Sequence, residues 1–459
     1  MSSSLKKRIK KLNNAKPING KSVVYVMSRD QRVKDNHALI AAQAHAQSLN
    51  LPLIVCFNVY PKIKNRAKNQ YVWMFEGLKK IEIDLKKKNI PFVLEVGNAV
   101  KAYKHWEKDF KPVAIYFDFS PLRGPKKVKK DFADKSSTPC YVVDTHNIIP
   151  VWEASDKNET AARTIRPKLF EKLEQYFIEP EKISKQKVDS KFKISNPSWA
   201  EVIKKIKAEE LANYKPIVES GEDEAKKVLN HFIKEKLKDY PTNRNEPVKD
   251  GQSNLSAYLH FGQISSLRVL LEIVKLKDIN PDQITEHKLS KALVNELFVW
   301  KELSDNFCYY EKDYDNIHGA SEWAIKSLDK HRKDERDSVY TLDELEKLRT
   351  HDNAWNAAQS QLMKTGKMHG YMRMYWAKKL LEWSTEPEIA IDNAIYLNDK
   401  YELDGYDPNG FAGIMWGIAG VHDHGWTERD IFGKIRYMNF EGLKRKFEID
   451  AYIEKYLKN

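Results

Sequence analysis

The sequence predicts an α/β domain with a parallel sheet, followed by a mostly α-helical domain. Up to about residue 150, short runs of β-branched residues alternate with amphipathic helical patterns. From Ala200 onward, apolar residues instead recur at spacings of three and four, and strand-like alternation is nearly absent. A chain of 459 residues also exceeds the size that one hydrophobic core usually supports. We therefore expect two or three domains.

Strand and helix patterns follow one another in the first domain. In chain order, we predict strands at 22–27, 53–59, 92–96, 114–118 and 140–144, with helices at 36–49 and 71–88. Ligands of such parallel sheets bind at the carboxyl ends of the strands. The relevant ends are residues 28–32, 57–61 and 118–123. The alternative for Arg29, Asp30 and Arg32 at the first end is that they only form loop salt bridges.

The domain boundaries follow changes in composition. Residues between the two domains are polar and interrupted, and 179–199 is rich in lysine and turn formers without a clean period. We divide the chain into a basic N-terminal tail at 1–20, the α/β domain at 21–150, an interdomain linker with a mobile loop at 151–199, and the helical domain at 200–459.

Composition limits the class of protein. The N-terminus lacks the apolar run of a secretory signal, and no stretch of about 18 apolar residues occurs. The three cysteines form neither a metal-ligand spacing nor a disulfide framework. We expect a protein that is not secreted, cytoplasmic in a prokaryote or nuclear in a eukaryote. A formal net charge of +13 favours a polyanionic partner, although many lysines will only be solvated.

Tryptophans are concentrated in the second domain, where seven of the eleven lie between Trp300 and Trp426. Residues 365–383 are predicted to form one helix, on which Trp376 and Trp383 share a face roughly 10 Å apart. Trp355, in the preceding polar segment, could sit between them. A core role is the alternative, but this crowding indicates a redox or base-stacking site.

Two other patterns in this domain carry polar chemistry. Ser253 and Ser256 precede helical residues, so they can cap backbone amides, and such a helix start also suits a phosphate. Capping is favoured on the local pattern alone. Glu296 and Trp300 are four residues apart and share a helix face, offering a hydrogen-bond acceptor and a stacking surface. A buried tryptophan beside a surface glutamate is the alternative.

Two charged segments lie towards the end of the chain. Residues 396–409 are rich in carboxylates but lack the alternating oxygen ligands and terminal Glu of a calcium loop, so we expect no metal site. The segment 434–447 interleaves basic residues with aromatics. Its basic residues suit phosphate contacts, with a solvated face as the alternative for each of them.

Four segments resemble those of one known family, the class II cyclobutane pyrimidine dimer photolyases. These are SNLSAYLHFGQISS, WKELSDNFCYY, TGKMHGYMRMYWAKKLLEW and LNDKYELDGYDPNGFAGIMW, in family order, and the resemblance runs from about residue 23 to 456. It implies a Rossmann-like antenna domain and a helical domain that binds FAD. The implied reaction is light-driven repair of cyclobutane dimers in double-stranded DNA. Excited reduced FAD gives an electron to the flipped-out lesion, which returns it after the ring splits. We expect a monomer.

The resemblance also implies which residues bind the flavin. Asn398 would face N5 of the flavin, where a neutral amide favours a reduced form, and Asp404 would pair with Arg373 beside the ring. The segment 253–256 would wrap the diphosphate. The full implied set is Tyr240, Ser253, Asn254, Leu255, Ser256, Gln263, Lys301, Asp305, Arg373, Asn398, Asp404 and Asp407.

For the lesion and the DNA, the implied set is Glu296, Trp300, Met374, Trp416, Arg244, Lys434 and Arg436. Such an enzyme lifts the dimer from the duplex and holds it against aromatic rings. The resemblance also implies an electron path to the flavin through three tryptophans. Trp376 would lie nearest the flavin, Trp355 in the middle and Trp383 outermost.

Two matters stay open in the sequence. Family members commonly carry a second chromophore, a deazaflavin or folate, but they often read DNW where this chain has Asp35, Asn36 and His37. A cryptochrome-like blue-light photoreceptor is the alternative function, since it would share the flavin and the tryptophans. Cryptochromes often have a long C-terminal extension, whereas this chain stops soon after Tyr456, which favours repair.

Overall fold

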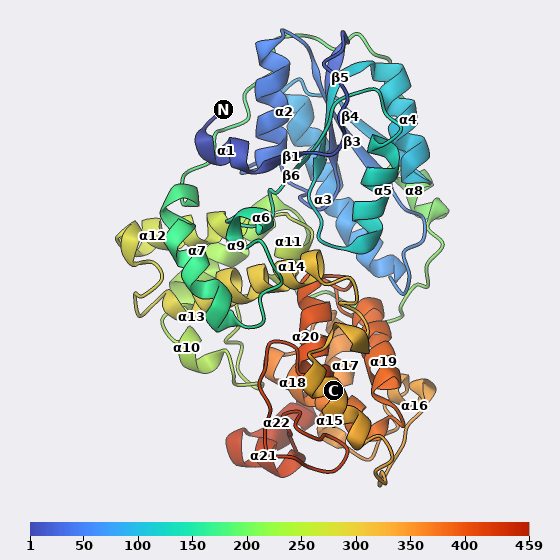
Figure 1. Cartoon of the computed structure of the whole chain (residues 1–459), viewed down its shortest axis with the longest axis vertical. Coiled ribbons are helices and arrows are strands. Elements are labelled where there is room, and N and C mark those ends of the chain that lie inside the picture. The colour runs from blue at the N-terminus through green and yellow to red at the C-terminus, as the bar shows by residue number, and fades with distance from the viewer. Residues whose placement is uncertain (459) are drawn as a thin grey trace.

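The computed structural model, which describes residues 1–458, has an α/β lobe and a helical lobe (Figure 1). Six strands form one sheet in the order β1-β6-β5-β2-β3-β4, and all neighbours are parallel except the antiparallel pair β1 and β6. The strands are β1 (Ile9–Lys11), β2 (Ser22–Met27), β3 (Leu53–Val59), β4 (Phe92–Val96), β5 (Pro112–Asp118) and β6 (Cys140–Val143). The predicted α/β class and the five predicted strands are confirmed.

Helices cover both faces of this sheet. Val23 and Tyr25 of β2 pack in one core with the helices α2 and α3, whereas Val24 and Val26 pack in a second core with α4 and α5. A strand buried on both faces is apolar throughout, which explains the unbroken run in β2. The helices of this lobe are α1 (Ser3–Lys7), α2 (His37–Ser48), α3 (Lys68–Lys87), α4 (Ala99–Phe110) and α5 (Arg123–Ala133).

The N-terminal segment belongs to the sheet lobe. Residues 1–20 were expected to be a basic tail, but α1 and β1 lie within them, and β1 pairs with β6. Arg8 is buried and donates hydrogen bonds to the carbonyls of Asp144, Asn147 and Ile148. A buried guanidinium that satisfies three carbonyls fixes this segment, which its basic composition concealed.

The segment between the lobes is also tied to the rest of the fold. It contains α6 (Val151–Ala154), α7 (Ala162–Tyr176) and the start of α8 (Trp199–Lys205). Within the predicted mobile loop, Asn196 exchanges two hydrogen bonds of 2.9 Å with the backbone of β4, and Gln186 accepts from the backbone of Leu53 at 2.6 Å. The loop therefore covers the free edge of the sheet, and these hydrogen bonds anchor two residues of the segment that was expected to be mobile.

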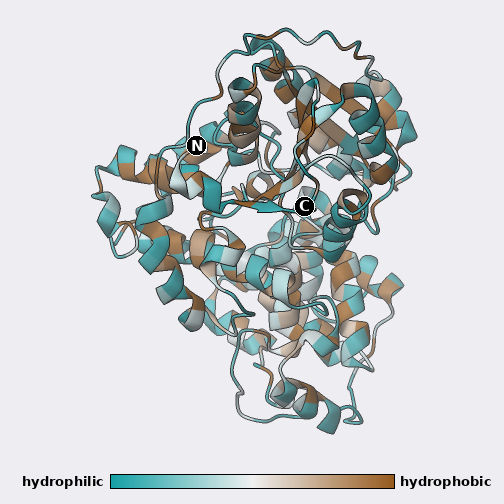
Figure 2. Ribbon diagram, turned by 45° about the horizontal axis from the view of Figure 1, so that its top comes forward, coloured by the Kyte–Doolittle hydropathy of each residue, from teal (hydrophilic) through white to brown (hydrophobic). Residues whose placement is uncertain are grey.

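The second lobe is helical, as predicted (Figure 1). Figure 2 shows hydrophobic residues along the strands and hydrophilic ones over much of the outer helices. None of the helices in residues 1–458 is long and apolar enough to span a membrane. The α-helices are α9 (Glu222–His231), α10 (Tyr240–Asn243), α11 (Ser256–His260), α12 (Ser266–Lys277), α13 (Lys291–Val294), α14 (Lys301–Tyr310), α15 (Glu322–Lys330), α16 (Leu342–Glu346), α17 (Asn353–Thr365), α18 (Gly370–Trp383), α19 (Pro387–Tyr401), α20 (Pro408–Ala419), α21 (Phe440–Lys446) and α22 (Ile449–Ile453). Short π-helical turns at Phe232–Lys236, Asn295–Trp300 and Glu454–Lys458, and 3₁₀ turns at Pro281–Gln283 and Ile317–Gly319, complete the lobe.

The single helix predicted at 365–383 is wrong in its first turn. Thr365 ends α17, and Gly366 closes that helix with φ of 70°, a conformation that favours glycine. His369 then caps α18, accepting a hydrogen bond from the backbone of Tyr371 at 3.2 Å. Residues 366–369 are therefore the turn between two helices, and this turn lets Trp355 return towards α18.

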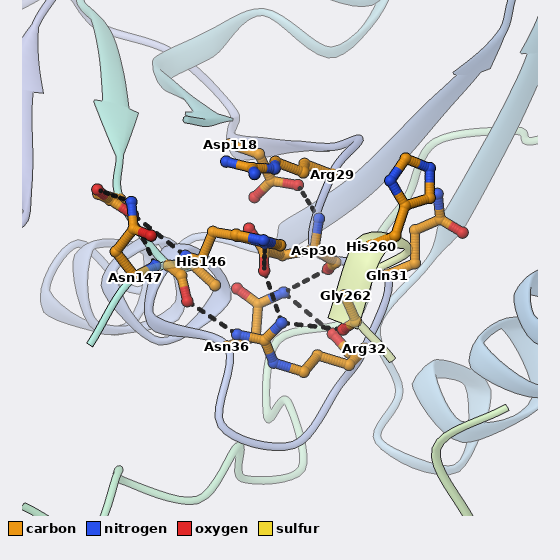
Figure 3. A network of polar contacts seen from close by, with 12 residues as sticks. Arg29, Asp30, Gln31, Arg32, Asn36, Asp118, His146, Asn147, His260 and Gly262 are labelled. Atoms are coloured by element: carbon orange, nitrogen blue, oxygen red, sulfur yellow. Dashed lines mark hydrogen bonds and ion pairs between the residues drawn. The ribbon is translucent and has the colours of Figure 1, made fainter. Parts of the chain in front are cut away.

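A buried polar network joins the two lobes (Figure 3). Arg29 forms a two-pronged pair with Asp305 of α14, with distances of 2.7 and 2.8 Å, and Asn147 donates to the same carboxylate at 2.9 Å. Arg32 bonds Asp30 at 2.6 Å and the carbonyl of Gly262 at 2.9 Å. The loop after β2 thus forms the salt bridges of the alternative, and the bonds of Arg29 to Asp305 and of Arg32 to Gly262 cross between the lobes.

Breaking the Arg29–Asp305 pair should destabilise the fold. Burial alone raises the pKa of Asp305, but the charge and hydrogen bonds of Arg29, together with Lys301 and His146, hold that pKa below its ordinary value. The pair therefore stabilises the fold above the unfolded-state pKa of about 3.9 and loses this effect as the pH falls through the folded-state pKa. Asp305→Ala leaves a buried charge unpaired and should lower the free energy of unfolding by ~3–5 kcal/mol near pH 7, measured by urea denaturation.

The matched control is Asp223→Ala, which removes an exposed pair with Lys34. Exposed pairs contribute less than about 1 kcal/mol. Equal unfolding free energies of the two variants at pH 7 would contradict the structural role of Asp305.

Candidate functional site

A cavity of about 630 Å³ opens in the helical lobe. Its size is typical of sites for cofactors and small molecules. Its walls come from α14, α18 and α20, the turn before α14, and the loop after α20. Ten of the predicted site residues line it: Tyr240, Arg244, Glu296, Trp300, Arg373, Met374, Trp376, Asn398, Trp416 and Arg436.

One part of the cavity is aromatic. Trp300 lies at the end of the π-helical turn before α14, and Trp416 lies on α20. Glu296 stands at the half-exposed rim, where Arg244 donates to its carboxylate at 2.5 Å. Two indoles and a carboxylate that line one cavity offer stacking surfaces and a hydrogen-bond acceptor to a flat heterocycle.

Behind Trp416 lies a buried lysine that sequence reasoning missed. The Nζ of Lys378 is 5.1 Å from the centre of the Trp416 ring and donates to the carbonyl of Gly417 at 2.5 Å. Burial lowers the pKa of Lys378 to about 7, against the opposing effect of Asp423. In a lysine-rich chain, no sequence signal separates this residue from solvated lysines.

Another part of the cavity is polar and contains a correction. Arg373 was expected to pair with Asp404, but its guanidinium pairs with the buried carboxylate of Glu402. Burial raises the pKa of Glu402 to about 8, although Arg373 lowers it. Asn398 lines the cavity and donates to Asp399 at 3.1 Å. A Cβ on Gly410 would approach the Asn398 amide nitrogen to 3.0 Å, so glycine leaves this amide room.

The predicted phosphate-binding segment lies beside the cavity without lining it. Asn254 has φ of 58°, and its side-chain oxygen accepts from the Nζ of Lys367 at 2.5 Å. Leu255 is buried, whereas Ser256 is exposed and starts α11 without a side-chain cap, so the capping alternative is not observed there. Ser253 is partly buried.

Two groups near this segment fit an anionic dinucleotide. Burial lowers the pKa of Lys367 to about 8, and a nearby diphosphate would raise that pKa again. The Nε of Arg244 is buried and has no hydrogen-bond partner among the described residues. An unpaired buried donor is costly unless a ligand satisfies it. These features fit the FAD that the sequence predicts.

The structure does not bring several predicted residues into the cavity. Trp300 and Ser304 line it, so the next residues along α14, Lys301 and Asp305, point about 100° away, into the interlobe network. Four further residues do not line the cavity. Gln263 bonds Ser220 and Gly221, and Asp407 bonds His260 beside a different cavity. Asp404 is half-buried and Lys434 is exposed.

Three buried indoles lead away from the cavity. Trp376 lines it, and its ring is parallel to that of Trp355 within 5°, with centroids 6.3 Å apart. Trp355 meets Trp383 edge to face at 5.7 Å. Trp355 therefore lies between the other two, as predicted. The Trp376 indole donates to Gln359 at 2.9 Å, a residue four positions after Trp355 whose helical spacing could have indicated this contact.

An α/β lobe joined to a helical lobe is the fold that this chain shares with solved photolyases and cryptochromes. A cryptochrome of Synechocystis sp. PCC6803 matches with a TM-score of 0.73 and 13% identity, covering 96% of this chain and 89% of that one. An archaeal photolyase from Sulfolobus tokodaii matches with a TM-score of 0.68 and 15% identity, covering 95% and 90%. At these identities the likeness establishes the fold alone.

Sequence comparisons are more specific. The family model for DNA photolyase matches residues 23–210. Deoxyribodipyrimidine photo-lyase of Arabidopsis thaliana is 43% identical over 442 residues, covering 94% of this chain and 88% of that protein. The protein of the same name from Methanothermobacter thermautotrophicus is 39% identical over 454 residues, covering 98% and 97%. The chain belongs to the DNA photolyase family.

Proposed function

We propose that this chain repairs cyclobutane pyrimidine dimers in double-stranded DNA, driven by light, as a deoxyribodipyrimidine photo-lyase. The observation that carries the proposal is a single cavity that combines an aromatic pair, Trp300 and Trp416, with Asn398 and the first indole of the Trp376 series. The names of relatives about 40% identical over nearly the whole chain support it. Two carbon–carbon bonds of the dimer break, with no net redox change.

The roles of the protein residues follow from this arrangement. Bound FAD, when reduced and excited, supplies the electron that splits the dimer and accepts it back. Tyr240, Arg373 and Asn398 would hold the cofactor within the cavity, and Lys367 and residues 253–256 would bind its phosphates. The Asn398 side chain is neutral, so it adds no charge next to the flavin.

The remaining cavity residues receive the lesion. Trp300 and Trp416 stack on the flipped thymines and exclude water, and Met374 of α18 contributes another part of the cavity wall. The Glu296 carboxylate accepts a hydrogen bond from a thymine imide N–H, while the hydrogen bond from Arg244 orients it. These contacts select a pair of splayed bases over a stacked duplex.

A blue-light photoreceptor of the cryptochrome kind is the second candidate, because a solved cryptochrome shares the fold. Both functions would use the flavin and the indoles. Illumination of the reduced protein with dimer-containing DNA separates them: a photolyase restores the thymines over many turnovers, whereas a photoreceptor leaves the dimers intact.

We further propose a second, antenna chromophore in the α/β lobe. A cavity of about 390 Å³ lies at the carboxyl ends of β2, β3 and β5, where ligands of such sheets bind. Gln31 lines it, and its side-chain oxygen is buried without a partner among the described residues. Asn36, within the segment that departs from DNW, caps α2 and bonds Tyr25 instead of lining the cavity. A deazaflavin or folate would add a near-ultraviolet band to the flavin spectrum of the purified protein.

The DNA partner leads to a prediction about salt. Arg436 lines the lesion cavity, and Lys434 and the last turn of α21 add further positive charge. We propose that the protein binds DNA as a monomer. Contacts of these basic residues with phosphates should dominate its binding to undamaged duplex DNA. Affinity should fall steeply with salt, and Lys434→Ala should reduce the logarithmic slope by about 1. Lys86→Ala, on an exposed part of α3, is the control. If the DNA affinity of the parent protein does not change with salt concentration, these phosphate contacts do not contribute to binding.

A further inference from the structure

The outermost indole of the proposed electron path does not reach solvent. Trp383 is only 2% exposed, so a reductant in solution cannot touch its ring effectively. Besides Trp355, two rings pack edge to face against it: Tyr340, with centroids 5.2 Å apart, and His351, at 5.4 Å. Tyr340 is half-exposed and His351 is exposed. These two rings join the buried Trp383 to the solvent-accessible surface.

Tyr340 and His351 are joined in a way that suits coupled proton movement. The Tyr340 hydroxyl lies 2.6 Å from Nδ1 of His351, and the backbone N–H of His351 donates to the same hydroxyl at 3.0 Å. With that backbone donor fixed on the oxygen, the hydroxyl proton is free to point at Nδ1. The exposed imidazole can then pass a proton on to water.

The charges around Trp383 favour moving an electron hole outward. The Nζ of Lys379 lies 5.6 Å from the Trp383 ring centre, so a radical cation on that indole faces a like charge. The salt bridge of Lys379 to Glu382, at 2.8 Å, reduces this repulsion without removing the ammonium group. A tyrosine that loses its proton on oxidation becomes a neutral radical and escapes the repulsion.

We propose that Tyr340 is the terminal electron donor of the tryptophan series and that His351 is its proton acceptor. The proposal rests on the electron path included in the proposed function. When Trp383 lacks one electron, Tyr340 supplies it, and its O–H bond breaks as the proton moves to Nδ1 of His351. Trp383 is restored, and a tyrosyl radical and an imidazolium remain. A thiol reductant in solution gives a hydrogen atom to the tyrosyl oxygen, and His351 releases its proton to water.

The test compares Tyr340→Phe with the parent flavoprotein. Phenylalanine keeps the ring against Trp383 but cannot lose a proton. Illumination without thiol, followed by rapid freezing and electron paramagnetic resonance, should give a tyrosyl signal in the parent and only a tryptophan signal in the variant. The yield of photoreduced flavin with thiol should fall several-fold. Tyr141→Phe, on β6 of the other lobe and stacked on Tyr116, should behave as the parent does.

His351→Ala tests the proton step separately. This variant keeps the phenol but should lose most of the tyrosyl signal, and added imidazole should restore it. A parent without a tyrosyl signal, or a Tyr340→Phe protein with unchanged radical spectrum and yield, would overturn the proposal. Repair by protein whose flavin has been reduced chemically is measured alongside. Failure of that repair in the parent contradicts the proposed function, whereas the tyrosyl signal reports on Tyr340 alone.

Discussion

Trp376→Phe is expected to abolish light-driven reduction of bound flavin while leaving repair by chemically reduced enzyme intact. Trp376 is the indole of the series that lines the cavity, and its ring is parallel to that of Trp355. Phenylalanine keeps most of the volume but is much harder to oxidise, so the path is cut at its first step. The catalytic electron moves only between flavin and lesion, and it does not need this path.

The structure indicates how to control this experiment. Trp376→Phe leaves the buried Gln359 side-chain oxygen without its donor, which should cost about 1–3 kcal/mol and leave the protein folded. Trp106→Phe, in the core of the α/β lobe, is a matched buried substitution whose indole nitrogen has no partner among the described residues. If Trp376→Phe, Trp355→Phe and Trp383→Phe all photoreduce at the parent rate, the three residues serve only the core.

The second large effect is expected at the lesion walls. Trp300→Ala or Trp416→Ala should weaken binding to dimer-containing DNA by ~1–3 kcal/mol, because each removes a stacking surface for a flipped base. This corresponds to roughly 5-fold to 150-fold in dissociation constant. Flavin content and affinity for undamaged duplex should change little, since phosphate contacts dominate the latter.

Fluorescence anisotropy with damaged and undamaged duplexes measures both affinities in one series. Trp199→Ala is a suitable control, because Trp199 is half-buried on α8, packs on Phe75 and bonds Glu82 far from the cavity. Unchanged affinity of both wall variants for the damaged duplex would remove Trp300 and Trp416 from the lesion site.

The fold could be predicted where local pattern and burial agree. The strands β2, β3 and β4 begin and end where their apolar runs do, because both sheet faces are covered. The three-residue strand β1 was missed, since Ile9–Lys11 is mostly basic and its pairing with β6 depends on the buried Arg8. Edge strands that rest on such tertiary bonds leave no periodic signal.

In the site, too, contacts within one helix could be predicted, whereas contacts between distant segments could not. Helical spacing placed Glu296 with Trp300, and Trp376 with Trp383, because residues on one helix keep fixed relative directions. It could not choose between Glu402 and Asp404 as the partner of Arg373, which is decided by how the turn after α19 folds. It also could not show that Arg29, 276 residues away, is the partner of Asp305 at the lobe interface.

The central claim, light-driven repair at the cavity of Trp300 and Trp416, is tested most directly with a duplex that carries one thymine dimer. The protein, with its flavin chemically reduced, is mixed with an excess of this DNA, and restored thymines are counted after blue light or darkness. The account predicts many repaired dimers per protein molecule in light and none in darkness. It also predicts that Trp376→Phe repairs as the parent does. No restoration of thymines in light by reduced, DNA-bound protein would contradict it.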